Sequence, residues 1–174
     1  MINFIKILIA EDEHIIAKDI SSTLTRLGYD VIGMASSGEE IVKKAAEIRP
    51  DLILMDIMLK GGMDGISTTE MLHKDYDIPV IYLTAYADEA TLNRAKITEP
   101  SGYLLKPFEE RELHTTIETA LYNHRMEMKI KESEKWLSTT LNSLGEGMIA
   151  SDADGKIKMF NPAAEKLTGW EKSE

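Results

Sequence analysis

The chain has 174 residues, about one ordinary domain and a remainder, and is 43% hydrophobic and 29% charged. Lys and Arg contribute 20 positive charges against 30 negative charges from Asp and Glu; the net charge of −10 disfavours binding to nucleic-acid backbones. The absence of cysteine excludes disulfide bonds, thiolate catalysis and cysteine-ligated metals. The apolar start is too short to span a membrane and lacks a signal-peptide cleavage pattern, so we expect a cytoplasmic protein with no membrane partner.

Short apolar runs alternate with amphipathic stretches in the first two thirds of the chain. The runs are rich in Ile, Val and Leu without inside–outside alternation, which is typical of strands buried on both faces of a parallel sheet; they cover residues 4–10, 31–35, 52–55, 80–83 and 103–105. The stretches between them repeat apolar residues every three or four positions, which predicts helices, with Ser36 or Ser37 capping the second and Asp88 the fourth. Five strands alternating with five helices predict an α/β fold with ligands at the carboxyl ends of the strands.

The fifth predicted helix is unusually long, because no Gly or Pro occurs between Glu109 and Asn142. A helix of this length would extend about 50 Å, well beyond a small domain, so we expect residues 124–143 to form a helical linker. Its sparse apolar positions fit two heptad frames: Leu137, Leu141 and Leu144, and Ile117, Leu121 and Met128. This pattern predicts a homodimer through the fifth helix and linker, with a broken coiled-coil register.

Strand signals return in residues 144–174, on both sides of the hairpin turn signal Asp154-Gly155. Asn161 and Pro162 predict the start of a short helix and Gly169 its end. A segment this short cannot bury its own core, so we expect a fragment of a larger domain or a segment that docks elsewhere. The predicted organisation is a domain over residues 1–123, a linker over 124–143 and a further segment over 144–174.

Acidic side chains follow the first and third predicted strands, namely Glu11, Asp12 and Asp56. At one edge of a parallel sheet these carboxylates would converge and repel one another unless a cation lay between them. Mg²⁺, or Mn²⁺ in its place, prefers such oxygen ligands together with phosphate oxygens. Thr84 and Lys106, which end the fourth and fifth strands, would add a hydroxyl and an ammonium. These residue types predict a phosphoryl site in which a carboxylate is the nucleophile.

Residues 4 to about 123 resemble the receiver domains of two-component response regulators. The motifs that carry the resemblance are Ile7-Leu8-Ile9-Ala10-Glu11-Asp12-Glu13, Asp51-Leu52-Ile53-Leu54-Met55-Asp56, Met63-Asp64-Gly65, Leu83-Thr84-Ala85 and Gly102-Tyr103-Leu104-Leu105-Lys106-Pro107-Phe108. The resemblance implies a flavodoxin-like, doubly wound five-stranded parallel sheet with strand order 2-1-3-4-5. It also implies phosphorelay signal transduction, in which the receiver catalyses its own phosphorylation and slow dephosphorylation.

The resemblance also implies roles for particular residues. Asp56 would accept a phosphoryl group from a partner histidine kinase or phosphotransfer protein. Mg²⁺ would be bound by Asp12, Asp56 and the Met58 backbone carbonyl, and by Glu11 through water. The phosphoryl group would contact Thr84, the Ala85 backbone N–H and Lys106, with Thr84 and Lys106 assisting the reaction. Tyr103 would move inward with Thr84 and switch the face made by the fourth helix, fifth strand and fifth helix; Lys106-Pro107 would be a cis bond.

One position departs from the pattern of the family, which often has Pro four residues after its phosphoacceptor. Here Lys60 occupies that position and Gly61-Gly62 follow. We expect a more flexible loop with an added cation near the site, and a solvated Lys60 side chain. Met58 and Tyr86 would flank the pocket, and Tyr86 would shield the phosphoryl group from water.

The last segment resembles the first two strands and first helix of a PAS domain, an α+β unit. The motifs are Gly147-Met148-Ile149, Asp152-Ala153-Asp154-Gly155-Lys156-Ile157 and Asn161-Pro162-Ala163-Ala164-Glu165-Lys166-Leu167-Thr168-Gly169-Trp170. The sequence contains no helix-turn-helix pattern, so we expect no nucleic-acid partner. Two alternatives stay open: the N-terminal part of a hybrid sensor histidine kinase, and a dimerisation module that acts without phosphorylation.

Overall fold

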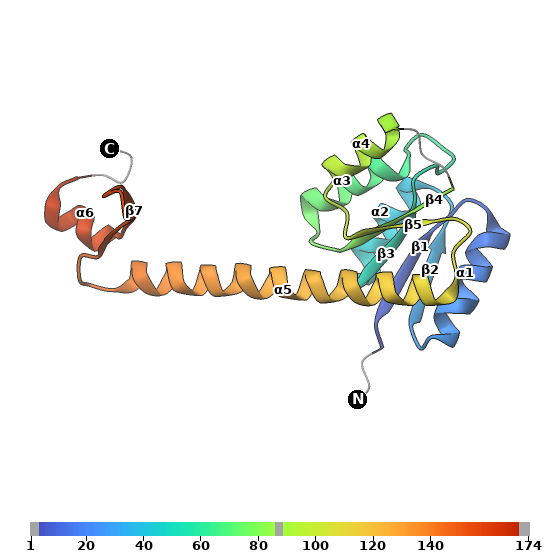
Figure 1. Ribbon diagram of the computed structural model, residues 1–174, viewed down its shortest axis with the longest axis horizontal. Helices are drawn as coiled ribbons and strands as arrows, with labels where there is room; N and C mark the ends of the chain where they lie inside the picture. The colour runs from blue at the N-terminus through green and yellow to red at the C-terminus, as the bar shows by residue number, and fades with distance from the viewer. Residues whose placement is uncertain (1–3, 86–88, 171–174) are drawn as a thin grey trace. The chain divides into compact units, whose positions relative to one another are not determined.

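The computed structural model describes residues 4–85 and 89–170, which fall into two compact units divided between Arg125 and Met126. In the first unit strands and helices alternate along the chain (Figure 1). The elements are β1 (Lys6–Ala10), α1 (His14–Arg26), β2 (Asp30–Ala35), α2 (Gly38–Ile48), β3 (Leu52–Asp56), α3 (Gly65–Asp75), β4 (Val80–Thr84), α4 (Glu89–Ile97), β5 (Gly102–Leu105) and α5 (Glu110–Ser143).

The five strands form one parallel sheet in the order β2-β1-β3-β4-β5, which confirms the predicted flavodoxin-like topology. The register aligns the strand ends: Asp56 of β3 lies beside Leu83 of β4, and Thr84 lies beside Leu105 of β5. The segments that follow the strands therefore leave the sheet at one edge, which is where parallel sheets of this kind bind ligands.

Alternate residues of the central strands point into two separate cores. Leu8 and Met55 pack with apolar side chains of α2, α3 and α4, whereas Ile9 and Leu54 pack with those of α1 and α5. The prediction that every strand is buried on both faces is correct for β1, β3 and β4, apart from Lys6, and wrong for β2 and β5. The latter two are the edges of the sheet, where each strand has a neighbour on one side only.

The helix boundaries combine expected and unexpected signals. Ser37 caps α2 by accepting a hydrogen bond from the Glu40 backbone N–H, as predicted. Gly28 follows α1 with a φ of 91°, where a residue without a side chain relieves strain. Arg49 ends α2 in the left-handed region, which the sequence did not indicate. The predicted cap Asp88 lies outside the described residues.

Helix α5 is continuous over 34 residues, as the absence of Gly and Pro predicts. Its first turns bury Leu113, Ile117, Ala120 and Leu121 against the sheet. Two polar contacts tie these turns to the rest of the unit. Arg26 of α1 lies 2.6 Å from Glu110, and the buried Tyr29 hydroxyl lies 2.9 Å from both Glu118 and His114. Burial, and then the hydrogen bond to Glu118, raise the pKa of Tyr29.

The second unit contains an antiparallel hairpin of β6 (Ile149–Ser151) and β7 (Ile157–Phe160), followed by α6 (Pro162–Thr168). Asn161 caps α6 as predicted, and it also does more. Its side chain accepts from the N–H groups of Ala164 and Met148 and donates to the carbonyls of Leu141 and Glu146. One buried amide therefore joins the end of α5, the hairpin and α6.

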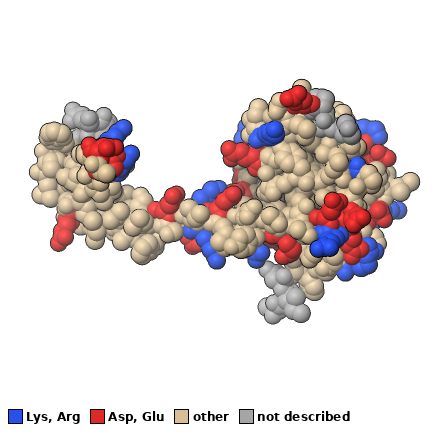
Figure 2. Space-filling model, viewed as in Figure 1, with Lys and Arg blue, Asp and Glu red and all other residues tan. Residues whose placement is uncertain are grey.

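The surface of the first unit mixes the two signs of charge. On the face shown in Figure 2, acidic side chains occur together with Lys and Arg over several elements. Across the described residues, no helix combines the length and the hydropathy that crossing a bilayer requires.

Candidate phosphoryl and metal site

Three carboxylates converge at the carboxyl edge of the sheet. Glu11 and Asp12 follow β1 and Asp56 ends β3, and each can bring an oxygen within 4.8 Å of the others. Their side chains are largely withdrawn from solvent, with 0%, 9% and 12% of the surface exposed respectively. Burying like charges this close together is unfavourable unless cations compensate them.

Lys106 supplies one compensating cation from the end of β5. Its Nζ donates to Asp56 Oδ2 at 2.6 Å and forms a short contact with Glu11 Oε2. Burial lowers the pKa of Lys106, but its hydrogen bonds to Asp56 and Glu11 outweigh burial, so that the net shift is upward. Burial raises the pKa of Glu11 above its ordinary value of 4.5, although both interactions with Lys106 oppose that shift.

Backbone groups hold the two ends of this arrangement in place. The Met58 N–H donates to Asp56 Oδ1 at 2.8 Å, so both oxygens of Asp56 have a partner. The Lys106 N–H donates to the Thr84 carbonyl at 2.7 Å, and the Lys106-Pro107 peptide bond is cis, as expected.

Of the other predicted site residues, Thr84, Ala85 and Met58 lie around the same edge, whereas Tyr103 pairs with Tyr82 further back along the strands. Thr84, at the end of β4, is 8% exposed, and Ala85 and Met58 line the hollow that also contains Asp56 and Lys106. Tyr103 is 38% exposed, and its ring centroid lies 5.9 Å from that of the buried Tyr82. Tyr86, the predicted shield, lies outside the described residues.

The site opens into a hollow of about 750 Å³. Asp12, Asp56 and Lys106 line it together with apolar side chains of α1 and of the segment before α5, among them Ile15, Ile16 and Phe108. Ile15 is 84% exposed, which is unusual for a large apolar residue.

Two features of the loop between β3 and α3 were missed at the sequence level. A Cβ on Gly65 would lie 2.0 Å from the Asp56 carbonyl oxygen, so only glycine allows α3 to begin so close to the end of β3. Asp64 caps α3 through the Ser67 N–H at 2.8 Å and also pairs with Arg94 of α4 at 3.0 Å. Asp64 was the available signal for the cap, because Asp is a preferred residue at the N-cap of a helix.

Lys60 supplies the added cation expected near the site, and its side chain is solvated as expected, but it also has a partner that was not predicted. Its side chain is 81% exposed, but its Nζ lies 2.7 Å from Asp12 Oδ2. The loop conformation decides this contact, and residue spacing alone gives no indication of it.

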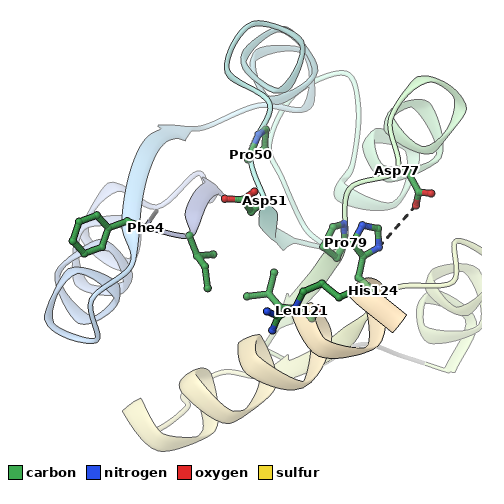
Figure 3. Close-up of a pocket in the computed structure, with 9 residues that line it drawn as sticks. Phe4, Pro50, Asp51, Asp77, Pro79, Leu121 and His124 are labelled. Carbon is green, nitrogen blue, oxygen red and sulfur yellow. Dashed lines mark hydrogen bonds and ion pairs between the residues drawn. The ribbon is translucent and has the colours of Figure 1, made fainter. Parts of the chain in front are cut away.

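A second hollow of about 380 Å³ lies at the opposite edge of the sheet, where β3 and β4 begin (Figure 3). Pro50, Pro79, Leu121 and His124 line it, and His124 lies 3.9 Å from Asp77 across its mouth. None of the three converging acids contributes to it, so the chemistry predicted for those acids belongs to the first hollow.

The donor set of the first hollow fits a hard divalent cation. All three side chains offer carboxylate oxygens, and their ligand atoms lie close enough to share one ion. Mg²⁺ and Mn²⁺ favour such oxygen ligands over nitrogen or sulfur.

Comparisons with known proteins agree with this architecture. The family model of the response regulator receiver domain matches residues 7–118, and that of the PAS fold matches residues 137–174. The phyllosphere-induced regulator PhyR of Methylorubrum extorquens is 39% identical over 67% of this chain and 43% of its own length. The transcriptional regulatory protein PdtaR of Mycobacterium tuberculosis is 34% identical over 69% of this chain and 58% of its own length. The chain thus spans about half the length of these curated relatives.

Solved structures show the same likeness. The signal receiver domain of a modulated diguanylate cyclase from Desulfovibrio desulfuricans G20 is 40% identical, with a TM-score of 0.69 over 72% of this chain and 99% of that one. The N-terminal domain of a response regulator/sensory box/GGDEF three-domain protein from Carboxydothermus hydrogenoformans is 38% identical, with a TM-score of 0.66 over 71% of this chain and 98% of that one. The chain therefore belongs to the response regulator receiver family of two-component signalling, and a PAS segment follows its receiver domain.

Proposed function

We propose that the first domain receives a signal by accepting a phosphoryl group on Asp56. The observation that carries this proposal is the Lys106 ammonium, which bridges Asp56 and Glu11 in a group of three converging carboxylates. A purely structural strand-end acid would need neither neighbouring carboxylates nor a buried cation, because both are costly to bury.

The reaction requires a nucleophile, charge compensation and a leaving group. An Asp56 carboxylate oxygen attacks the phosphorus of a phosphohistidine on a histidine kinase or phosphotransfer protein; the P–N bond breaks, and its electron pair stays on the imidazole nitrogen. Lys106 compensates the charge of the transferred oxygens. Glu11, Asp12, Asp56 and the Met58 carbonyl would hold Mg²⁺ or Mn²⁺, which would neutralise further charge on those oxygens. Attack of water on the acyl phosphate then resets the site slowly.

Thr84, Ala85 and Tyr103 would convert phosphorylation into a change of shape. Thr84 and the Ala85 N–H would bind the new phosphoryl oxygens from the end of β4. The half-exposed Tyr103 ring would follow Thr84 inward and alter the face formed by α4, β5 and α5. Support comes from the shared strand register, which places Thr84 beside Leu105, next to Lys106.

The linker helix would carry the response as a homodimer. Beyond the receiver core, α5 exposes large apolar side chains, among them Met128, Ile130, Trp136 and Leu137. These exposed apolar side chains favour a second copy of the helix as the partner. We propose a division of the chain into a receiver (1–123), a linker (124–143) and a PAS segment (144–174). We also propose that the protein acts in the cytoplasm, as its sequence leads us to expect.

The PAS segment supports one further candidate, the N-terminal part of a hybrid sensor kinase, because a sensory PAS segment follows the receiver domain along the chain. The similar protein of C. hydrogenoformans combines its response regulator domain and sensory box with a GGDEF domain instead. In either case Asp56 would be the phosphoacceptor, so the same experiment tests both.

Mass spectrometry after incubation with acetyl phosphate and Mg²⁺ tests the proposal. We expect the mass of one phosphoryl group on the wild type and none on Asp56→Asn. Asp51→Asn is the matched control, since Asp51 precedes the same strand at the opposite edge of the sheet and accepts a hydrogen bond from the Lys6 backbone N–H there. Unchanged wild-type mass, under conditions that phosphorylate another receiver, would instead favour a dimerisation module that acts without phosphorylation.

A further inference from the structure

Lys60 stands apart from the residues of the proposed mechanism. It lies in the loop between β3 and α3, and its ammonium lies 2.7 Å from an oxygen of Asp12, a proposed metal ligand. The two partners differ strongly in exposure: 9% of the Asp12 side chain is accessible against 81% of Lys60. The cation therefore reaches an almost buried carboxylate from the solvent side.

The backbone conformation on both sides of Lys60 fixes the position of its Cα. The preceding residue, Leu59, is buried in the core formed with α2, α3 and α4. The following residue, Gly61, has a φ of 126°, a conformation that side chains other than glycine rarely adopt. The Cα of Lys60 is thus held between a buried anchor and a glycine turn, while its flexible stem stays free to swing.

The charges of the site give this contact a consequence. Three carboxylates and the ammonium groups of Lys60 and Lys106 sum to −1. Binding of a divalent cation would bring this sum to +1 with Lys60 in place, and to zero if Lys60 were absent. Conversion of Asp56 to an acyl phosphate adds about one further negative charge, so a phosphorylated, metal-loaded site is neutral only when Lys60 is present.

We propose that Lys60 is an exchangeable counter-ion that competes with the divalent cation for Asp12 in the resting receiver and favours joint occupancy of the site by metal and phosphoryl group. This inference rests on the proposed function of the site. Because the stem is exposed, the ammonium can leave Asp12 without disturbing the core.

Calorimetric titration of the full chain with Mg²⁺ at low ionic strength tests the competition. Lys60→Gln should bind Mg²⁺ roughly two- to fivefold more tightly than wild type, a range set by exposed ion pairs. Lys60→Arg keeps the charge, so its Mg²⁺ affinity should stay within about twofold of that of the wild type. Lys74→Gln makes the same change of net charge on the exposed end of α3, away from the site, and should leave the affinity unchanged.

A second titration, with beryllium fluoride as a phosphoryl mimic on Asp56, tests joint occupancy. The advantage of Lys60→Gln should disappear or reverse, and added salt should shrink the difference in both titrations. Equal or weaker Mg²⁺ binding by Lys60→Gln without the mimic overturns the inference while leaving the metal site intact. Absence of Mg²⁺ binding in every protein, wild type included, overturns the inference and the proposed metal site together.

Discussion

Replacing Lys106 with methionine should destabilise the metal-free receiver severely, because it leaves two buried carboxylates without their cation. Lys106 is 13% exposed and its partners Glu11 and Asp56 are 0% and 12% exposed. Removing one partner of a buried ion pair costs about 3–5 kcal/mol, and here one ammonium serves two carboxylates. We therefore expect a loss of about 4–5 kcal/mol in the free energy of unfolding at neutral pH, measured by urea denaturation followed by circular dichroism.

The pH dependence of this loss identifies its cause. Both interactions with Lys106 lower the pKa of Glu11, so their removal raises that pKa further above 4.5. Between the ordinary pKa and the raised one, folded Glu11 holds a proton that the unfolded chain has released, so stability falls as pH rises through this window. The defect of Lys106→Met should thus be larger at neutral pH than in mildly acidic buffer.

Lys44→Met is the matched control, since Lys44 pairs with Glu40 on the surface of α2 at 2.8 Å. A pair exposed to this degree contributes at most about 1 kcal/mol. The reasoning would be refuted if Lys106→Met were no more destabilised than Lys44→Met, or if its defect were the same in neutral and acidic buffer.

Three further predictions concern Gly65, Ile117 and Glu11. Gly65→Ala should unfold at lower urea concentration than wild type and lose phosphoryl acceptance in the mass assay, because the new Cβ would lie 2.0 Å from the Asp56 carbonyl oxygen. Ile117→Ala should lower the free energy of unfolding by about 2–5 kcal/mol, whereas Thr119→Ala on the exposed side of α5 should change it by less than about 0.5 kcal/mol. Mg²⁺ affinity, followed by calorimetry, should fall as pH drops through the raised pKa of Glu11, since protonated Glu11 is a poor ligand, and Glu11→Gln should flatten that dependence.

The sequence predicted the fold well where one physical rule decided the outcome. The runs of β1, β3 and β4 are apolar almost throughout, with Lys6 as an exposed exception, because helices cover both faces of these strands. The same composition does not distinguish the edge strands β2 and β5, whose partial exposure depends on sheet order. Helix α5 was predictable because nothing in its sequence interrupts a helix.

The site was predictable to the level of strand ends and no further. Parallel topology is enough to bring the carboxyl ends of β1, β3 and β5 to one edge of the sheet, so the convergence of Glu11, Asp56 and Lys106 could be predicted from their positions at the strand ends. The contact between Lys60 and Asp12 could not be predicted in this way, because it depends on the φ of Gly61 and on the burial of Leu59. The fit of Gly65 beneath Asp56 likewise depends on how closely α3 approaches β3, which residue spacing does not encode.

The path from the site to α5 is short in both sequence and space. Lys106 ends β5 and α5 begins at Glu110, so any displacement of the Lys106 backbone acts directly on the start of the helix. The first turns of α5 pack in the same core as Leu54 and Leu83, whose neighbours in the chain include Thr84. Repacking Leu113 and Ile117 individually would open cavities in that core, at a cost of about 1 kcal/mol or more each. The proposed phosphorylation of Asp56 therefore predicts a displacement of the first segment of α5 as a unit, with Leu113 and Ile117 still packed in the same core.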